Sequence, residues 1–144
     1  MSFTGSFNYS IDERGRVPLP PPWREAFQDG IVLSRGSPDK CIRVQTPEEF
    51  EATKRKIRAA SPLSTTGRDL RRLLVSTVYE TQLDAQSRVL IPNWLREYAG
   101  IDTRVRVIGM DESIEIWSPE AYDADLERIA AVVASELDSL DERR

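Results

Sequence analysis

The chain has 144 residues, a formal net charge of −4, one cysteine and no histidine. The absence of histidine removes the commonest general base and metal ligand, and a lone cysteine forms no internal disulfide, which predicts a reducing, cytoplasmic setting. No apolar run is long enough to cross a membrane, and residues 1–5 lack the basic start and apolar stretch of a signal peptide. We therefore expect neither a membrane span nor secretion.

The net charge hides an uneven distribution of charged residues. Residues 1–110 carry 17 basic and 13 acidic side chains, whereas residues 111–144 carry 3 basic and 11 acidic ones. Because salt screens charges beyond about 10 Å, a ligand responds to the local patch rather than to the net charge. The body of the chain therefore remains compatible with an anionic partner.

The first half begins with two short strands and a tight turn. Residues 6–11 are rich in aromatic and β-branched side chains, which indicates a strand. In Asp12-Glu13-Arg14-Gly15, aspartate takes the first turn position and glycine the fourth, as in a three-residue hairpin loop with a left-handed glycine. Arg16 then starts a return strand that ends at Pro20.

A short helix and a second hairpin follow. Pro22 opens the helix, because proline is favoured in a first helical turn, and Trp23 and Phe27 share its buried face at a spacing of four. Residues 31–33 and 41–44 are the expected strands of the hairpin.

Longer helices connect and end the two halves. Thr46-Pro47-Glu48-Glu49 combines an N-cap, a proline and two first-turn acids, and predicts a helix to about Ala60. Residues 61–67 have the composition of a linker, and residues 68–74 continue into a further helix. A C-terminal helix is expected over residues 118–137.

The second half repeats the first, 72 residues later. Both copies contain Asp-x-x-x-Arg-Val-x-(Leu/Ile)-Pro, at residues 12–20 and 84–92. The second copy has a first strand within residues 75–83, a short helix capped by Gly100, and a closing hairpin within residues 105–117. A module of about 50 residues buries too little apolar surface alone, so we expect both copies to share one pseudo-symmetric core.

These boundaries divide the chain into four segments. They are a first module with its trailing helix (5–60), a linker with the connecting helix (61–76), a second module with the C-terminal helix (77–137), and a charged tail that is expected to fray (138–144).

The repeated Asp-x-x-x-Arg pairs allow two interpretations. In the structural one, Asp12 and Asp84 cap their turns and pair with Arg16 and Arg88 across the hairpin base. In the functional one, the loops place guanidinium groups near a symmetry axis, where they fork onto phosphates or guanine edges. Arg14 at the loop tip has little structural role in the pattern, which adds some weight to the functional interpretation, and both interpretations stay open at this point.

Other candidate chemistry is weak. Cys41 lies among apolar strand residues without an activating base and is expected to be a buried core thiol. The basic cluster at residues 54–58 fits a solvated helix face paired with Glu49 and Glu51 better than a nucleic-acid patch. No glycine-rich phosphate loop is present. We therefore predict no catalytic residue, metal, cofactor or small-molecule substrate.

Together these motifs resemble the MraZ family of bacterial transcriptional regulators. The matching segments are Asp12-Glu13-Arg14-Gly15-Arg16-Val17-x-Leu19-Pro20-x-x-x-Arg24, then Asp84-x-x-x-Arg88-Val89-x-Ile91-Pro92-x-x-x-Arg96-Glu97-Tyr98-Ala99-Gly100, and Ile114-Glu115-Ile116-Trp117. The resemblance covers nearly the whole chain, and two such motifs at this separation are far more specific than either alone.

The resemblance implies an α+β, mainly β fold, in which two tandem AbrB-like swapped-hairpin modules interleave as an internal pseudo-dimer with flanking helices. It also implies a ring-like homo-oligomer, in the cytoplasm at the nucleoid, that binds short direct repeats in double-stranded DNA upstream of its own operon, the division and cell-wall gene cluster, as a repressor. The implied DNA contacts are Arg14, Arg16 and Arg88, with Arg24 and Arg96 as further candidates, and the residues that orient the loops are Asp12, Gly15, Asp84 and Ser87.

The chain departs from the family pattern at a few positions. Ser87 replaces a loop glycine, and because a left-handed serine costs about 1 kcal/mol, we expect that turn to be shifted or slightly strained. Pro21 and Pro22 stand where the family has a small residue and a lysine. Pro18 must lie where the return strand needs no ladder hydrogen bond.

An alternative function is an antitoxin-like protein-interaction module that acts through the acidic C-terminal helix. One stripe of that helix is apolar and consists of Tyr122, Leu126, Ile129, Val133 and Leu137. The stripe either binds a partner or packs on the chain's own core or on a neighbouring subunit.

Overall fold

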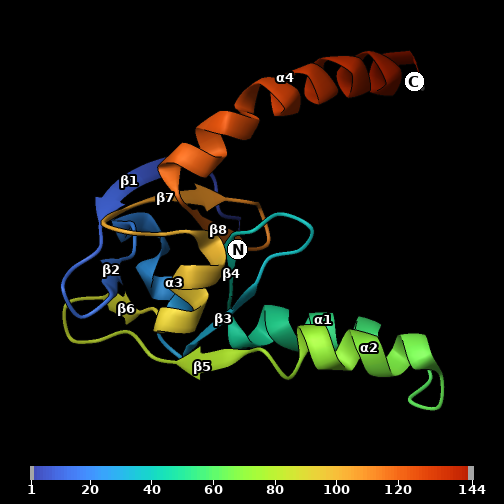
Figure 1. Ribbon diagram of the computed structural model, residues 1–144, viewed down its shortest axis with the longest axis horizontal. Helices are drawn as coiled ribbons and strands as arrows, with labels where there is room; N and C mark the ends of the chain where they lie inside the picture. The colour runs from blue at the N-terminus through green and yellow to red at the C-terminus, as the bar shows by residue number, and fades with distance from the viewer. Residues whose placement is uncertain (1, 143–144) are drawn as a thin grey trace.

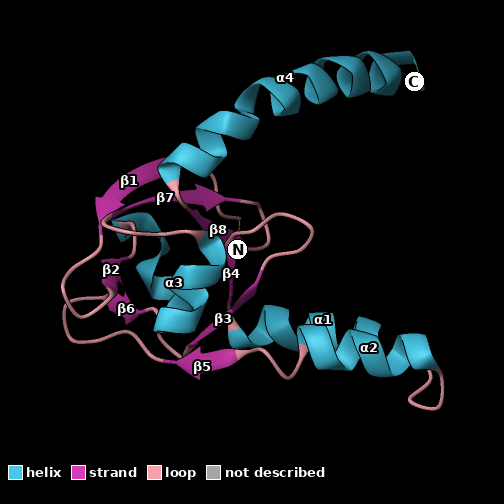
Figure 2. Cartoon of the chain, in the orientation of Figure 1, coloured by secondary structure: helices cyan, strands magenta, loops and turns pink. Residues whose placement is uncertain are grey.

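The computed structural model describes residues 2–142, which form a β body with two helical arms (Figures 1 and 2). The strands are β1 (Ser6–Ser10), β2 (Arg16–Pro18), β3 (Ile31–Arg35), β4 (Ile42–Gln45), β5 (Tyr79–Thr81), β6 (Arg88–Leu90), β7 (Arg104–Gly109) and β8 (Ile114–Trp117). The helices are the 3-10 helix η1 (Pro21–Phe27) and the α-helices α1 (Pro47–Arg58), α2 (Thr65–Leu74), α3 (Asn93–Ala99) and α4 (Pro119–Glu142).

The strand order shows that the two copies are interleaved. One antiparallel sheet has the order β1-β7-β8-β4-β3-β5, and β2 pairs with β6 in a separate two-stranded ladder. The order is symmetric about β4 and β8, where Ile42 lies opposite Ile116. Because β1 pairs with β7 and β5 with β3, the first strand of each copy joins the closing hairpin of the other. The α+β architecture of two swapped-hairpin modules is therefore confirmed.

The first hairpin of each copy differs from the local prediction. The turn itself forms, since the Gly15 N–H donates to the Asp12 carbonyl at 3.0 Å and the Asp12 N–H to the Arg16 carbonyl at 3.1 Å. Beyond it the strands diverge, and β2 pairs with β6, with Val17 opposite Val89. A three-residue strand makes few ladder bonds, and the exchange buries both valines completely in the shared core.

A single core joins the two copies, as the small size of each module predicts. Leu19, Leu33 and Ile42 of the first copy and Ile91 and Ile116 of the second are fully buried in the same cluster. Aromatic rings close one end, where Phe3 stacks on Phe27 with 5.4 Å between centroids and meets the edge of Trp23 at 5.7 Å.

Capping side chains explain where several helices begin and end. The Thr46 hydroxyl accepts the Glu49 N–H at 3.1 Å, and Gly100 closes α3 at φ +65°, as predicted. The Ser64 hydroxyl accepts the Gly67 N–H, so α2 starts at Thr65 and takes in part of the expected linker. Val75 ends α2, which shortens the expected strand over residues 75–83 to β5.

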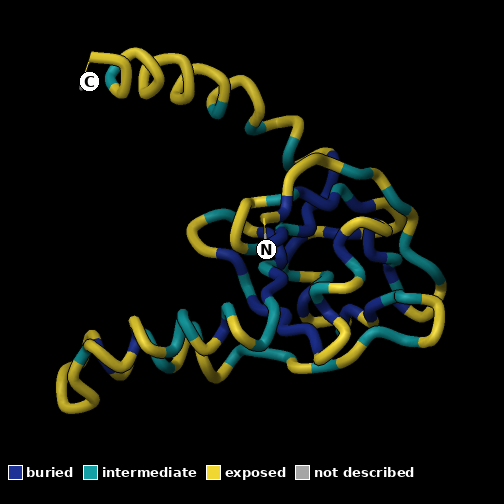
Figure 3. Tube along the Cα trace, turned by 180° about the vertical axis from the view of Figure 1, so that it is seen from behind, coloured by how far each residue is buried: buried dark blue, intermediate teal, exposed yellow. Residues whose placement is uncertain are grey.

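Two helical arms leave the body on the same side, at opposite ends of the sheet (Figure 1). One is the antiparallel pair α1–α2 and the other is α4, which continues to Glu142, beyond the predicted end near residue 137. Most of α4 is exposed, in contrast to the body (Figure 3). Within residues 2–142, no helix is both long and apolar enough to cross a bilayer.

Candidate nucleic-acid interface

The loops at residues 12–15 and 84–87 lie next to each other at the end of the body opposite the two arms (Figure 1). The β2–β6 ladder brings them together. The Ile91 N–H donates to the Gly15 carbonyl at 2.8 Å, and the Leu19 N–H donates to the Ser87 carbonyl at 3.1 Å. Each loop is thus held by the return strand of the other copy, so the pair is a product of the interleaved fold.

Each loop is organised by its aspartate. Asp12 Oδ1 accepts the backbone N–H groups of Arg14 and Arg16, each at 2.9 Å, and Oδ2 accepts Arg16 Nε at 2.7 Å. Asp84 makes the same set of bonds to the N–H groups of Gln86 and Arg88, at 2.9 Å each, and to Arg88 Nε at 2.9 Å. The capping and pairing roles predicted from the sequence are confirmed.

These donors also set the charge state of the two carboxylates. The backbone N–H of Arg16 and then its guanidinium hold the pKa of Asp12 below its usual value, and the Arg88 N–H does the same for the pKa of Asp84. Both aspartates are therefore ionised at neutral pH, and each keeps its arginine in place by charge as well as by geometry.

The two pairs touch and form one group, the Asp–Arg cluster, which consists of Asp12, Arg16, Asp84 and Arg88. Arg88 Nη1 lies 3.6 Å from Asp12 Oδ2, so the second loop contacts the carboxylate of the first. The arginine side chains are each 27% exposed, which leaves part of each guanidinium open to solvent. The Nε atoms face the carboxylates, so for Arg16 the terminal N–H groups are the ones available to a ligand, whereas Arg88 Nη1 already lies near Asp12.

The loop tips differ between the copies. Arg14 is exposed at the tip of the first loop, and its counterpart in the second loop is Gln86. Gln86 Oε1 accepts Arg88 Nη2 at 3.0 Å, which occupies part of the edge of Arg88 that would face a ligand. Our sequence analysis did not single out Gln86, although the repeat itself aligns it with Arg14.

Arg24 and Arg96, on the short helices that follow the return strands, bond to backbone carbonyls close to the two loops. Arg24 Nε donates to the Leu19 carbonyl at 2.9 Å, and Arg96 Nε donates to the Ile91 carbonyl at 3.1 Å. Arg24 shares a groove with Asp84 and Ser87, and a Cβ added to Gly15 would lie 3.1 Å from Arg96 Cζ. Each helix arginine therefore stands beside the loop of the other copy. Within residues 2–142, Arg14, Arg24 and Arg96 have no carboxylate within ion-pair distance.

The structure shows how the chain accommodates Ser87 and Pro18, two of the positions at which it departs from the family pattern. Ser87 is left-handed, with φ +59°, where Gly15 has φ +82°. The Ser87 N–H still donates to the Asp84 carbonyl at 2.9 Å, so the turn is not shifted and any strain is confined to Ser87. Pro18 lies opposite Arg88, at a position of the β2–β6 ladder where the strands exchange no backbone hydrogen bond. The missing N–H of the proline therefore leaves no ladder bond unmade, as expected.

The other candidates lie away from this interface. Lys54 pairs with Glu51 at 2.5 Å, as predicted for a solvated helix face, but the expected pairing with the Glu49 carboxylate is not among the ion pairs of residues 2–142. The arm that carries Lys54 leaves the body at the end opposite the loops (Figure 1). Cys41 is fully buried, and burial raises the pKa of its thiol, which confirms the core assignment.

Two swapped-hairpin modules with paired, arginine-bearing loops define a tandem AbrB-like protein. The family model described as "MraZ protein, putative antitoxin-like" matches twice, over residues 2–73 and 74–142. The chain belongs to the MraZ family.

Curated proteins of the same family are similar in sequence to this chain over most of their length. The chain is 35% identical to a "Transcriptional regulator MraZ" of Dehalococcoides mccartyi, covering 85% of this chain and 87% of that one. It is 35% identical to the protein of that name in Thermomicrobium roseum, covering 90% of each, and 38% identical to that of Leifsonia xyli subsp. xyli, covering 92% of each. These relatives are named as transcriptional regulators and not as enzymes.

Proposed function

We propose that this protein is a transcriptional regulator that binds double-stranded DNA through its paired loops. The observation that carries the proposal is the Asp–Arg cluster, in which two modules place Arg16 and Arg88 side by side with their Nε atoms fixed by Asp12 and Asp84. An arginine held in this way loses little side-chain entropy when it forks onto phosphate or the O6/N7 edge of guanine.

The surrounding arginines complete the proposed surface. The two aspartates balance the charge of Arg16 and Arg88, so the positive surplus comes from Arg14, Arg24 and Arg96. Contacts of these three with phosphates would position the protein, and Arg16, whose Nε is bound to Asp12, would read bases with its terminal N–H groups. Arg88 would contribute less to base recognition, because its Nη2 already donates a hydrogen bond to Gln86.

A single chain offers few basic groups, so its affinity for DNA is expected to be weak and strongly dependent on salt. A ring-like homo-oligomer would present several copies to short direct repeats and raise the affinity by effective concentration. In this proposal the repeats lie upstream of the protein's own operon, the division and cell-wall gene cluster, and the bound ring represses it by covering the promoter. Residues 5–60 and 77–137 are the two modules, and the protein acts in the cytoplasm at the nucleoid.

Fluorescence anisotropy with the DNA upstream of the protein's own gene tests the proposal. Wild type should bind this DNA more tightly than scrambled DNA, with a steep salt dependence, and the Arg16→Ala/Arg88→Ala double variant should lose the preference. The matched control, Arg55→Ala/Arg68→Ala, removes two exposed arginines from the α1–α2 arm and should keep it. Equal and weak binding of both DNAs by wild type would refute the function.

A second candidate function is the antitoxin-like one, in which α4 binds a basic protein. The exposure and acidity of α4 support it, since residues 119–142 carry eight acidic side chains and one basic one. A variant that lacks residues 119–144 discriminates, because this function predicts unchanged DNA binding and the loss of a protein partner.

A further inference from the structure

The outward face of the β2–β6 ladder carries an apolar side chain beside its arginines. Val17 and Val89 lie opposite each other and are fully buried, so the residues next to them on each strand point away from the core. The outward positions are Arg16 opposite Leu90, and Pro18 opposite Arg88. Leu90 is 42% exposed, whereas the other three residues are half-buried.

The position of Leu90, more than its exposure, points to a role. Single apolar side chains are common on protein surfaces, and in the body Trp94 and Met110 are also exposed, although neither lies in the ladder. Leu90 lies directly opposite Arg16, the arginine whose terminal N–H groups are available to a ligand. A ligand that contacts Arg16 therefore also meets Leu90.

Arg16 and Leu90 form a close pair across the ladder. The Ile91 N–H donates to the Gly15 carbonyl at 2.8 Å, which makes the adjacent pair, Arg16 and Leu90, a non-hydrogen-bonded one. The side chains of such a pair are the closer ones in a ladder, with Cβ atoms about 4.5–5.5 Å apart. Because successive base pairs of B-DNA are about 3.4 Å apart along the axis, the two side chains reach neighbouring base pairs.

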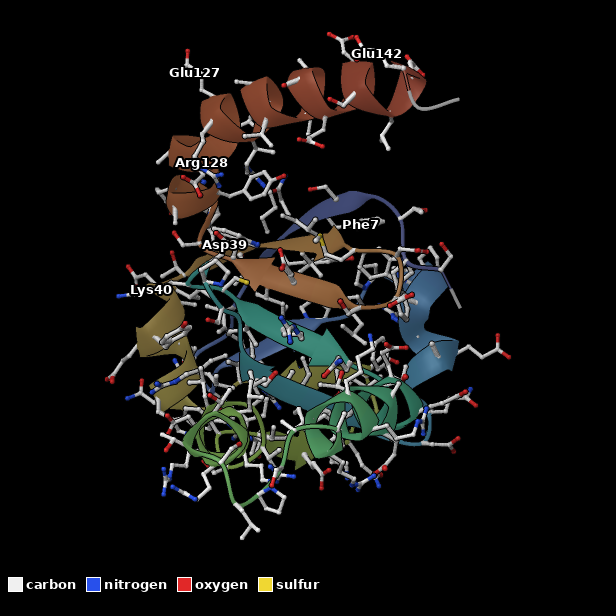
Figure 4. The ribbon with its side chains drawn as sticks, turned by 90° about the vertical axis from the view of Figure 1, so that its right-hand side faces the viewer. Phe7, Asp39, Lys40, Glu127, Arg128 and Glu142 are labelled. Atoms are coloured by element: carbon white, nitrogen blue, oxygen red, sulfur yellow. The ribbon has the colours of Figure 1, made fainter. Side chains whose placement is uncertain are left out.

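The ladder has a shape and a position that suit the major groove. Its two strands lie about 5 Å apart, and a two-stranded ribbon fits a major groove that is about 12 Å wide. The ladder lies on the side of the body away from the arms, at the left of Figure 1 and behind the body in Figure 4. Glu127 and Glu142 of α4, labelled in Figure 4, are on the arm side and leave the ladder open to an anionic ligand.

Thymine is the base that offers an apolar group to Leu90. In the major groove, guanine presents the acceptors O6 and N7, which arginine binds as a fork, and thymine presents its C5 methyl group. The leucine side chain has no donor or acceptor, so its contact with a polar base edge would remove water from that edge without replacing the hydrogen bond. Contact with the methyl group instead removes apolar surface of both partners from water.

The two ends of the ladder differ, so the chain is not symmetric toward DNA. Pro18 takes the place of Leu90 at the other end, opposite Arg88, and its ring closes on its own backbone and reaches less far. Arg88 also donates to Gln86 there. One end of the ladder therefore combines an arginine whose terminal N–H groups are available with an extended apolar side chain, and the other end does not.

We propose that Leu90 determines specificity by contacting the C5 methyl group of a thymine in the base pair next to the one that Arg16 reads. Because Pro18 stands at the equivalent position of the other copy, one chain recognises this step in a single direction, as a direct repeat requires and a palindrome does not. The inference rests on the proposed function, since it names a base that the paired loops select.

The test removes the methyl groups from the DNA. The DNA upstream of the protein's own gene is prepared with thymine or with uracil at every thymine position, which leaves base pairing unchanged. In fluorescence anisotropy, wild type should bind the uracil DNA at least about fourfold more weakly, the effect of one methyl group that is no longer buried. Leu90→Ala should bind the thymine DNA with a similar loss and should no longer distinguish the two DNAs.

Two further variants control for other causes. Leu90→Met keeps a long apolar side chain and should keep the preference for thymine. Met110→Ala truncates another exposed apolar side chain, between β7 and β8, and should bind both DNAs as wild type does. Leu90 is exposed, so the fold should survive its truncation, which circular dichroism verifies. A general effect of uracil on DNA shape would be equal in all four proteins and cancels in the comparison.

The outcomes separate this inference from the proposed function. If wild type binds the upstream DNA no better than scrambled DNA, both fail. If wild type prefers the upstream DNA but binds its thymine and uracil forms equally, the function stands and Leu90 reads no methyl group. If Leu90→Ala keeps the wild-type preference for thymine, another residue makes the contact and the proposal is wrong.

Discussion

Arg88 of the second copy lies 3.6 Å from the carboxylate of Asp12 in the first, measured from Nη1 to Oδ2. The contact joins two loops that are 72 residues apart in sequence, so the position of each guanidinium depends on both modules. A change in one loop should therefore affect the other.

The two loop residues with positive φ should respond in opposite directions to substitution. Ser87→Gly should raise the free energy of unfolding by up to about 1 kcal/mol, because glycine adopts φ +59° without steric cost. Gly15→Ala should lower it by about 1 kcal/mol or more, because a Cβ there would lie 3.1 Å from Arg96 Cζ and from the Ile91 carbonyl. Urea unfolding measures both, and equal effects of the two substitutions would contradict the geometry.

The second loop should gain affinity for DNA from a single change, Gln86→Arg. The substitution restores the tip arginine of the first loop and frees Arg88 Nη2 from its bond to Gln86. If both loops face DNA, the slope of log affinity against log salt should steepen by about one phosphate contact per chain. Gln86→Ala is the control for the loss of the Arg88 bond alone. An unchanged slope for Gln86→Arg would mean that the second loop does not approach DNA.

The aspartates should make the loops sensitive to acid. Hydrogen bonds from Arg16 and Arg88 lower the pKa of Asp12 and Asp84 below 3.8 in the folded state. A carboxylate with a lowered pKa contributes stability that is fully present above the unfolded pKa and is lost as the pH falls through the folded one. The destabilisation by Asp12→Asn/Asp84→Asn should therefore be seen at neutral pH and shrink below pH 3.8. A pH-independent difference would show that geometry and not charge supplies the effect.

Phe3 should be needed for the stability of the whole body, although it lies near the N-terminus. Its ring is 1% exposed and contacts Trp23 and Phe27, and its backbone bonds to Asp111 of the second copy. Phe3→Ala should lower the free energy of unfolding by about 3–5 kcal/mol. Met110→Ala, at an exposed position, should change it little. A small effect of Phe3→Ala would mean that the site collapses to fill the cavity.

Local features of the fold could be predicted because a few neighbouring residues determine them. The Asp12-to-Gly15 turn, the Thr46 cap and the Gly100 helix end depend on side-chain oxygens and on backbone conformations that only certain residues adopt. Boundaries were less accurate where two signals competed. Ser64 acts as the N-cap of α2, so Thr65 and Thr66 form the start of the helix, although the composition of this segment favoured a linker.

The candidate site was predictable in its residues but not in its arrangement. Spacing pairs Asp12 with Arg16, and the repeat gives the second pair, so both ion pairs follow from the sequence. The contact between Arg88 and Asp12 does not, because it requires β2 to leave β1 and pair with β6. The hydrogen bonds of Arg24 and Arg96 to the return strands likewise depend on how the helices pack.

The sequence by itself determined the repeat, the turns, the caps and the ion pairs within each loop, since these act over a few residues. Only the tertiary structure decided which strands exchange between the copies, that the loops share Asp12, and that α4 extends from the body without a cover. Strand exchange is favoured because two small modules bury more apolar surface together than apart. That gain is a property of the whole chain, and no short segment of the sequence specifies it.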